Sequence, residues 1–448
     1  MKALRDARFL LLLALTCLLS LPALAATVIR DAEIEDTVHR IADPVFEVAG
    51  LDRESIDIYL LNDPTLNAFV SGGQNLFINT GLILRTKNPD ELRGVIAHET
   101  GHIAGGHLSR TVEAREQAMV KTLLGAVLGV AAAVAGAPEV GTAMLFGGAT
   151  FGQQGMLAFS RGQEQAADQA AVNYLDRLHE SPEGLRDFFE TLENQNLRIS
   201  GGGNVYARTH PLTQDRIRFM DEQVVRSRYR DNHITGDLVD AHQRMVAKLD
   251  GFLSNPKDVL TRRQSDSIPD RYARAVALYR IPDVDGAIKI MDGLIVDEPK
   301  NPYFHELKGQ ILFENGKVAA AVSPYREAMR YRPASALIRI GLARALLEQG
   351  NDQASTAEAV ALLEEATRLE PRNPGAWRFL GIAYGKAGRE GMASMALAEQ
   401  AVLVGDKDDA RLYLRRARDA IPPSDPNWIR LQDLLRSVQD MPDPPRRR

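Results

Sequence analysis

The sequence predicts a mainly α-helical protein with one small β-sheet in its first half and a helical solenoid in its second half. Two observations support this prediction. The motif H-E-x-x-H at 98–102 lies in an apolar run with helical spacing, directly after short stretches that indicate strands. In the second half, Pro299, Pro333 and Pro371 are 34 and 38 residues apart. A period near 34 residues is typical of stacked helix pairs, and a generic helical bundle does not produce it.

The first 25 residues have the pattern of a cleavable signal peptide. A basic start, an apolar run over 9–21 and a small-x-small sequence at 23–25 are typical of such segments. We therefore expect export through the inner membrane of a bacterium and a periplasmic location. Cys17 is the one cysteine of the sequence and lies in this segment, so the mature chain cannot form an internal disulfide.

The composition is that of an ordinary globular protein, with 45% hydrophobic and 25% charged residues among 448. This length leaves room for two or three domains. The formal net charge is −5, and removal of residues 1–25 takes away three basic and one acidic side chain, so the mature chain carries −7. This balance does not indicate nucleic acid binding.

The stretches before the motif predict one helix and a small sheet. Residues 31–50 have apolar positions at helical spacing, and residues 55–60 alternate as a half-buried strand does. Residues 67–70 and 75–78 flank a glycine-containing turn and predict a hairpin. An edge strand of this sheet could pair with an extended peptide, or the hairpin could serve only the core; the two interpretations are compatible.

The motif itself predicts a metal site on a helix with defined ends. Asn88, Pro89 and Glu91 fit an N-cap, the first helical position and a capping-box acid, and Gly105-Gly106 offers an end. On this helix His98 and His102 project from one face and can both bind one Zn²⁺. The alternative is a helix with two incidental surface histidines.

Glu99 has the position of a general base. It is rotated by about 100° from His98 on the helix, so it lies beside the metal rather than on it. A glutamate there suits deprotonation of a zinc-bound water.

A third protein ligand is expected on a second helical segment. Such a zinc site needs another ligand, and no cysteine remains in the mature chain. The segment 160–171 supplies Glu164 and Asp168, four residues apart on one helix face. We assign Glu164 to the metal and Asp168 to the far ring nitrogen of a ligand histidine. From these residues alone, an exposed acid pair on a helix is the alternative.

The paired motifs resemble those of a known family. H-E-x-x-H at 98–102 followed by S-R-x-x-E-x-x-A-D at 160–168 is similar to the gluzincin metallopeptidases related to HtpX and the CaaX prenyl protease. The segments 67–69 and 72–82 also match this pattern, and the resemblance covers roughly residues 30–225. HtpX-like members are embedded by transmembrane helices, which we do not identify in this sequence.

The resemblance implies a gluzincin-type metallopeptidase domain with one Zn²⁺ per chain. The ion would be held by His98, His102 and Glu164. Glu99 would act as the base, and Asp168 would support a ligand.

Two further histidines, His107 and His210, are candidates for a role near the metal site. His107 follows His102 by five residues, is displaced from the ligand face of a helix and is interpreted as structural. His210 lies after the glycine run 201–203. It could stabilise an oxyanion, or it could occupy the open zinc position and keep the enzyme silent. The resemblance to exported members with helical repeats favours the second role, so our hypothesis is a removable fourth ligand.

The helix after His210 carries a possible catalytic arginine. Thr213 fits an N-cap, and Arg216 lies in the first turn that follows. We therefore expect Arg216 to be a catalytic residue together with Glu99, Asp168 and His210, with oxyanion stabilisation as its candidate role.

The apolar segment 120–159 has no assigned role. Its longest stretch without charge, 122–137, has 16 residues and falls short of the roughly 20 that span a bilayer. We expect a hairpin of two short helices. It could cover the active-site cleft, touch a membrane surface peripherally or dock a hydrophobic partner.

The second half predicts about four tetratricopeptide repeats. Small residues recur in three columns once a four-residue insertion near 352–357 is allowed: Ala287, Ala321 and Ala359; Gly309, Ala343 and Gly381; Gly316, Gly350 and Gly388. Such repeats stack into a curved solenoid whose concave face binds peptides or proteins. The expected divisions are a signal peptide (1–25), the metallopeptidase domain (26–225), a helical connector (226–267), the repeats (268–420) and a partly disordered tail (421–448).

Signal peptide, metallopeptidase domain and repeats together resemble exported family members that act in outer-membrane protein quality control. The resemblance implies a periplasmic zinc endopeptidase whose substrates are unfolded or stalled outer-membrane proteins. It also implies that the repeats contact the outer-membrane barrel assembly machinery. The alternative function is a chaperone or scaffold that works through the repeats, with the metal site latent and held closed by His210.

Overall fold

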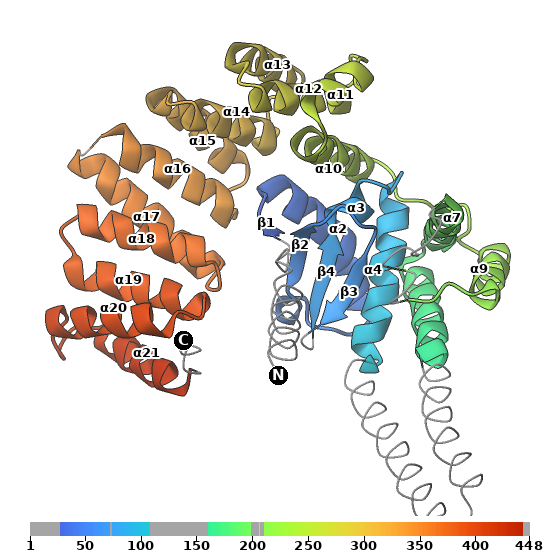
Figure 1. Cartoon of the computed structure of the whole chain (residues 1–448), viewed down its shortest axis with the longest axis horizontal. Helices are drawn as coiled ribbons and strands as arrows, with labels where there is room; N and C mark the ends of the chain where they lie inside the picture. The colour runs from blue at the N-terminus through green and yellow to red at the C-terminus, as the bar shows by residue number, and fades with distance from the viewer. Residues whose placement is uncertain are drawn as a thin grey trace, which may run out of the picture.

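The computed structural model confirms the predicted fold class, a mainly helical chain with one small sheet followed by a solenoid of helix pairs (Figure 1). The structure describes residues 27–71, 74–107, 160–198, 206, 210–350 and 352–441. The predictions for the signal peptide 1–25, the apolar hairpin 120–159, the glycine run 201–203 and the end of the tail, 442–448, lie outside the described residues.

The sheet has four described strands in the order β1-β2-β4-β3. They are β1 (Thr27–Ile29), β2 (Ile58–Asn62), β3 (Ala68–Ser71) and β4 (Asn75–Asn79). β2 and β4 pair in parallel, whereas β1 with β2 and β3 with β4 pair antiparallel. The rings of Tyr59, Phe77 and Phe69 stack across β2, β4 and β3, with centroids 5.1 and 4.9 Å apart. This cross-strand stacking fixes the register.

The predicted hairpin is present, but the strand predicted at 55–60 begins later. Asp52 caps a 3₁₀ turn over Arg53–Ser55 by accepting a hydrogen bond from the Glu54 amide, so the extended chain starts only at Ile58. The three-residue strand β1 was not predicted, because a segment that short shows no alternation.

The helices α2 (Ala32–Val48) and α4 (Pro89–Ala104) pack beside the sheet, and both have the expected ends. The N-cap Asn88 accepts a hydrogen bond from the Glu91 amide at 2.9 Å, and Gly105 is the C-cap of α4. Gly106 follows with φ of +60°, a left-handed conformation that favours glycine. The short helix α3 (Thr80–Ile83) joins β4 to this region.

Two helices cover the side of α4 that faces away from the sheet, a helix over 160–178 and α7 (Glu183–Arg198), and α9 (Gln214–Arg226) packs on the outside against α7. Glycines allow this close packing. A Cβ on Gly94 would lie 2.7 Å from the Leu185 amide nitrogen of α7, and a Cβ on Gly101 would lie 3.0 Å from Ala167 in the helix over 160–178. A side chain at either position would push these helices away from α4.

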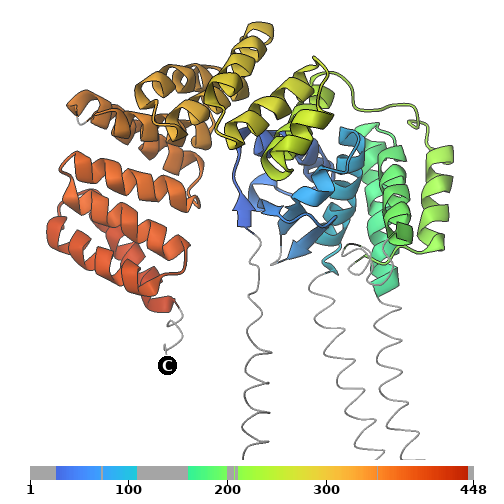
Figure 2. The same ribbon diagram turned by 45° about the horizontal axis from the view of Figure 1, so that its top comes forward.

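Five helix pairs form the described solenoid after α10 (Asp237–Leu253) and α11 (Pro256–Arg262). Their bounds are α12 (Ile268–Arg280), α13 (Val284–Asp297), α14 (Pro302–Glu314), α15 (Val318–Tyr331), α16 (Ala336–Gln349), α17 (Gln353–Leu369), α18 (Pro374–Lys386), α19 (Glu390–Leu403), α20 (Lys407–Ala420) and α21 (Trp428–Asp440). Figures 1 and 2 show them as an arc whose concave side faces the β1 edge of the sheet.

The repeat columns have a physical basis. A Cβ on Gly309 would lie 2.9 Å from the Tyr325 ring, and one on Gly381 would lie 2.8 Å from Leu397, so small residues are needed where paired helices touch. Gly316 and Gly388 end the first helices of their pairs with φ of +74° and +70°. The predicted insertion is absorbed by α17, which has 17 residues where α15 and α19 have 14.

The helix α21 lies within residues 421–448, for which the sequence predicted a partly disordered tail. Proline and aspartate in the preceding segment resemble an irregular linker, but Leu431, Leu434 and Val438 are buried at helical spacing against the end of the solenoid. Burial of this apolar face explains why the segment is ordered.

A buried charge cluster joins the two halves of the molecule. The side chain of Lys248 in α10 is fully buried, with 0% exposed. Its Nζ lies 2.8 Å from Asp31 Oδ2. Glu33 Oε2 and Glu306 Oε2 each lie 3.6 Å from the same nitrogen. The Tyr272 hydroxyl donates to Glu33 at 2.7 Å. Asp31 and Glu33 are at the start of α2, whereas Tyr272 and Glu306 belong to the first two helix pairs, so the cluster ties the sheet domain to the solenoid.

Further ion pairs lie between the sheet domain and the repeats. Arg30 Nη2 is 2.5 Å from Glu370 Oε2, and Arg372 Nη1 is 2.7 Å from Asp57 Oδ2. These side chains are exposed or partly exposed, so each pair contributes only ~0–1 kcal/mol.

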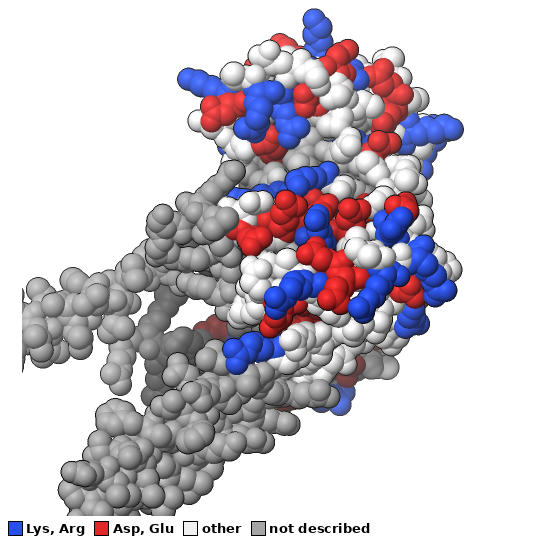
Figure 3. Space-filling view, turned by 90° about the vertical axis from the view of Figure 1, so that its right-hand side faces the viewer, with Lys and Arg blue, Asp and Glu red and all other residues white. Residues whose placement is uncertain are grey.

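The face formed by α7, α9 and their neighbours carries charges of both signs in alternation (Figure 3). Arg186 of α7 lies 3.2 Å from Asp221 of α9, and Arg228 lies 3.5 Å from Asp176. The described residues of this face therefore create no electrostatic potential of a single sign. Among the described helices, none is both long and apolar enough to cross a membrane.

Candidate metal centre

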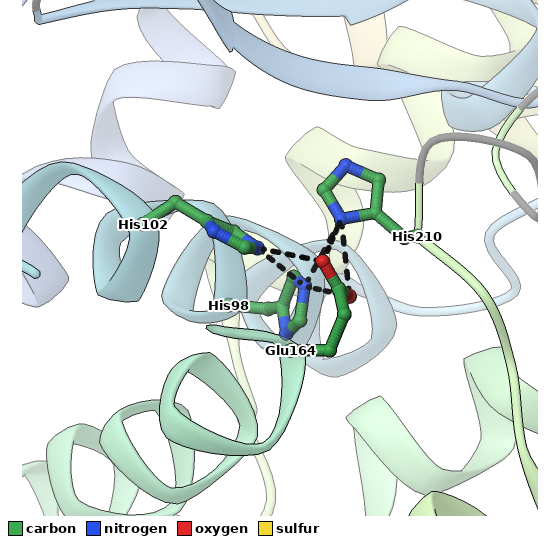
Figure 4. A group of neighbouring side chains, drawn as sticks. All are labelled: His98, His102, Glu164 and His210. Carbon is green, nitrogen blue, oxygen red and sulfur yellow. Dashed lines mark hydrogen bonds and ion pairs between the residues drawn. The ribbon is translucent and has the colours of Figure 1, made fainter. Parts of the chain in front are cut away.

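Four side chains from three segments converge at one point: His98 and His102 of α4, Glu164 of the helix over 160–178, and His210 from the segment before α9 (Figure 4). One ligand atom from each lies within 4.8 Å of all the others. Three of the four residues are buried, and His102 is partly exposed. This is the cluster type expected for a metal ion.

The donor atoms lie close enough together to share one metal ion. His98 Nε2 lies 3.1 Å from His102 Nε2 and 3.4 Å from His210 Nδ1. Oxygens of Glu164 lie 3.4 Å from each of the α4 nitrogens and 3.2 Å from His210 Nδ1. Tetrahedral zinc with bonds of about 2.0–2.1 Å separates its ligand atoms by roughly 3.3–3.4 Å. The ligand types therefore fit Zn²⁺, and these separations, which involve both Glu164 oxygens, lie near the expected value.

Close helix packing brings Glu164 to the histidines. Gly101 lies between His98 and His102 in α4 and faces Ala167 of the partner helix. Ala167 and Ala171 are fully buried, so the two backbones approach closely along this line. Glu164 lies one turn before Ala167 and thus reaches the ligand face of α4.

A second layer of charged groups lies behind the ligands. Asp168 Oδ1 is 2.9 Å from Nδ1 of His98, the ring nitrogen that points away from the cluster. Arg216 of α9 donates to both Asp168 oxygens, at 2.6 and 2.8 Å, and its Nη1 lies 2.9 Å from Glu164 Oε2. Burial alone would raise the pKa of Asp168, but the hydrogen bonds from His98 and Arg216 lower it below its usual value. Asp168 is therefore held as a carboxylate.

Arg216 is oriented by its surroundings and points to these two carboxylates. Thr213 is the N-cap of α9, as predicted, and the guanidinium also donates to the Pro211 carbonyl at 3.1 Å. The ring of Phe189 lies 4.9 Å from the guanidinium carbon. The arginine predicted as an oxyanion stabiliser thus has its guanidinium engaged with Asp168 and Glu164.

Glu99 lies beside the cluster and is fully buried. Its Oε1 accepts a hydrogen bond from the Tyr206 hydroxyl at 3.4 Å, whereas Oε2 accepts none from the described residues. Burial raises the pKa of Glu99, although the electrostatic interaction with His210 and His98 lowers it in part. A buried carboxylate with one oxygen free and a raised proton affinity has the properties of a general base.

His210 fills the space between the other donors and Glu99. Its Nδ1 faces the cluster, and its Nε2 lies 3.6 Å from Glu99 Oε1. The ring of Tyr206 stacks on the imidazole with centroids 4.6 Å apart. In this arrangement His210 takes the fourth donor position, where a hydrolytic site would hold water.

Sequence reasoning missed two neighbours of the site. Tyr206 contacts both Glu99 and His210, but no motif marks it other than its place four residues before His210. His107, interpreted as structural, has its Nδ1 2.9 Å from Nδ1 of His102. The helix-angle argument did not find this contact because α4 ends at Ala104 and the chain then turns back.

The model of peptidase family M48 matches residues 29–224, which include all of these side chains. Residues 29–224 are a peptidase family M48 domain. A tetratricopeptide repeat model matches residues 272–336 and 307–357, so the M48 domain is followed by repeats of that type, as predicted. The M48 assignment and the His/His/Glu cluster confirm the prediction of a metallopeptidase.

Relatives with both parts are similar over most of the chain. The beta-barrel assembly-enhancing protease of Yersinia pestis is 27% identical over 390 residues, covering 85% of this chain and 78% of the relative. The protein of the same name from Escherichia coli (strain K12) is 25% identical over 431 residues, covering 93% and 86%. The M48 domain alone is similar to mitochondrial metalloendopeptidase OMA1 of Schizosaccharomyces pombe, 27% identical over 185 residues, 41% of this chain and 51% of the relative.

Proposed function

We propose that the chain is a zinc-dependent endopeptidase of the periplasm, with an active site that His210 closes in this structure. The observation that carries the proposal is the set of four converging donors with the buried carboxylate of Glu99 beside them. His98, His102 and Glu164 would hold the ion permanently, and His210 would be the removable ligand.

The residues of the site have distinct roles in this proposal. Bound Zn²⁺ lowers the pKa of water and polarises a carbonyl group. Glu99 accepts the proton of the attacking water through Oε2 and later passes it to the leaving amine. Asp168 keeps the proton of His98 on Nδ1, so that Nε2 is free to bind the metal. Arg216 acts as a positioning residue, since it holds Asp168 and Glu164 in place.

The sheet supports a peptide as the substrate. β3 stands at the edge of the described sheet and lies beside α4 (Figure 1). An extended peptide could add to this edge through main-chain hydrogen bonds, which give affinity with little sequence selectivity.

The names of the relatives support the biological setting. We assign unfolded or stalled outer-membrane proteins as substrates, because the relatives that share both parts are called beta-barrel assembly-enhancing proteases. The repeats would contact the outer-membrane barrel assembly machinery, and residues 1–25 would direct export.

A second function follows from the closed site. If His210 stays in place, the chain works as a chaperone or scaffold through its repeats while the metal site is latent. The two functions can be distinguished in cells in which the Glu99→Gln variant is the sole copy of the protein. Normal outer-membrane biogenesis in those cells favours the scaffold, and loss of it favours the peptidase.

Removal of His210 tests the closed site. We expect His210→Ala to cleave casein about 10-fold faster than the wild type at saturating zinc, which corresponds to a closed state in about nine molecules of ten. The exposed His233, outside the cluster, gives the control His233→Ala, for which the rate should not change. An unchanged or lower rate for His210→Ala contradicts the switch and favours a transition-state role.

A further inference from the structure

His102 has a partner at its second ring nitrogen that the proposed function does not use. Its Nε2 faces the metal cluster, so its proton must lie on Nδ1 when the ring binds a metal ion. That Nδ1 is 2.9 Å from Nδ1 of His107, and the two rings meet edge to face at 77°. A donor and an acceptor therefore meet if His107 carries its own proton on Nε2.

The chain is shaped to bring His107 to this position. After α4 ends, Gly106 adopts φ of +60° and turns the backbone toward the helix. A Cβ on Gly105 would lie 2.5 Å from His107 Nε2, so a side chain there would displace the imidazole. The His107 ring is buried, with 6% of the residue exposed. The two glycines, interpreted from sequence as a helix end, thus also make room for this ring.

The backbone of His107 is also tied to the second metal helix. The Gln163 side-chain amide donates to the His107 carbonyl at 2.9 Å, and Gln163 directly precedes Glu164. The position of His107 is thereby coupled to the segment that supplies the carboxylate ligand.

The two ligands of α4 are supported in different ways. His98 is backed by the carboxylate of Asp168, whereas His102 is backed by an imidazole. A neutral acceptor can fix the ring and its tautomer without adding a second negative charge to a site that already holds Glu164 and Asp168.

We propose that His107 is a positioning residue that accepts a hydrogen bond from Nδ1 of His102 and fixes that ring for zinc. This inference rests on the proposed function, because it needs zinc at the cluster. Loss of such a supporting hydrogen bond typically weakens metal binding by about 10–100-fold.

The test compares side chains that keep or lose an acceptor at the Nδ1 position. In His107→Asn, Oδ1 lies where Nδ1 was. In His107→Gln the amide oxygen lies one bond farther out, and His107→Leu has no acceptor. The full-length protein is titrated with zinc against a chromophoric chelator, and the visible spectrum of the Co²⁺-substituted protein is recorded. We expect the zinc Kd to rise about 10–100-fold for His107→Leu and His107→Gln but only a few-fold for His107→Asn. The cobalt bands should shift in His107→Leu and His107→Gln alone.

His242 provides the matched control. It is buried to a similar degree, and its Nε2 lies 2.8 Å from the Thr86 hydroxyl, away from the cluster. His242→Leu should lower the thermal midpoint without changing the zinc Kd. The inference is overturned if His107→Leu and His107→Gln bind zinc as the wild type does, if His107→Asn binds zinc no more tightly than His107→Gln, or if His242→Leu weakens zinc binding equally. A wild type without zinc would instead overturn the proposed function.

Discussion

Glu99→Gln will bind zinc as the wild type does but will lose about 10²–10⁴-fold in casein cleavage. The amide has nearly the shape of the carboxylate but cannot accept a proton, and general bases contribute about this factor. Glu99 is not among the four converging donors, so zinc stoichiometry should stay at one per chain. The measurement is the cleavage rate and the zinc content of the same preparations.

The background for this experiment should be His210→Ala, because under the proposed closure by His210 the wild type would have a low rate that hides a loss. A matched control is Glu358→Gln, a partly exposed glutamate of α17 that pairs with Arg326 at 2.8 Å and is remote from the metal. If Glu99→Gln cleaved at the rate of this control, Glu99 could not be the base.

Lys248→Met will destabilise the folded protein by about 3–5 kcal/mol. The substitution removes the ammonium group from Asp31, Glu33 and Glu306, and breaking a buried ion pair from one side has this cost. Arg244 remains near Glu33, at 3.3 Å, but does not reach the other two carboxylates within ion-pair distance. Urea denaturation followed by circular dichroism measures the loss.

The exposed Lys289 of α13 provides the comparison, since Lys289→Met should change stability by no more than about 0.5 kcal/mol. Adding Glu306→Gln to Lys248→Met should restore part of the loss, because one uncompensated carboxylate is then neutral. Burial raises the pKa of Glu306 to about 7, which indicates that its charge is costly even with Lys248 present. A loss below about 1 kcal/mol for Lys248→Met would show that the cluster does not hold the halves together.

Features set by local sequence were predictable. The ends of α4 follow from Asn88, Pro89 and Gly105, and each acts through atoms within a few residues. The solenoid was predictable because its period repeats the same local packing, with a glycine or alanine at the positions where paired helices touch. The prediction that Glu164 converges with His98 and His102 came from the resemblance of the paired motifs to a known family, because sequence spacing alone does not bring the two helices together.

Features set by distant contacts were not predictable. Lys248 meets Asp31 across 217 positions of sequence, and a lysine in an amphipathic helix looks solvent-exposed until its partners are known. His107 was interpreted from the angle of a continuing helix, whereas the left-handed turn at Gly106 brings it to His102. Arg216 was expected to face the substrate, but Asp168 and Glu164 attract its guanidinium from another helix.

Zinc K-edge X-ray absorption of the purified full-length protein tests the central claim most directly. The account predicts one zinc per chain with three imidazole nitrogens and one carboxylate oxygen at about 2.0–2.1 Å, and one imidazole fewer in His210→Ala. A protein that retains no zinc, or a zinc site whose spectrum is unchanged by His210→Ala and by Glu164→Ala, would contradict it.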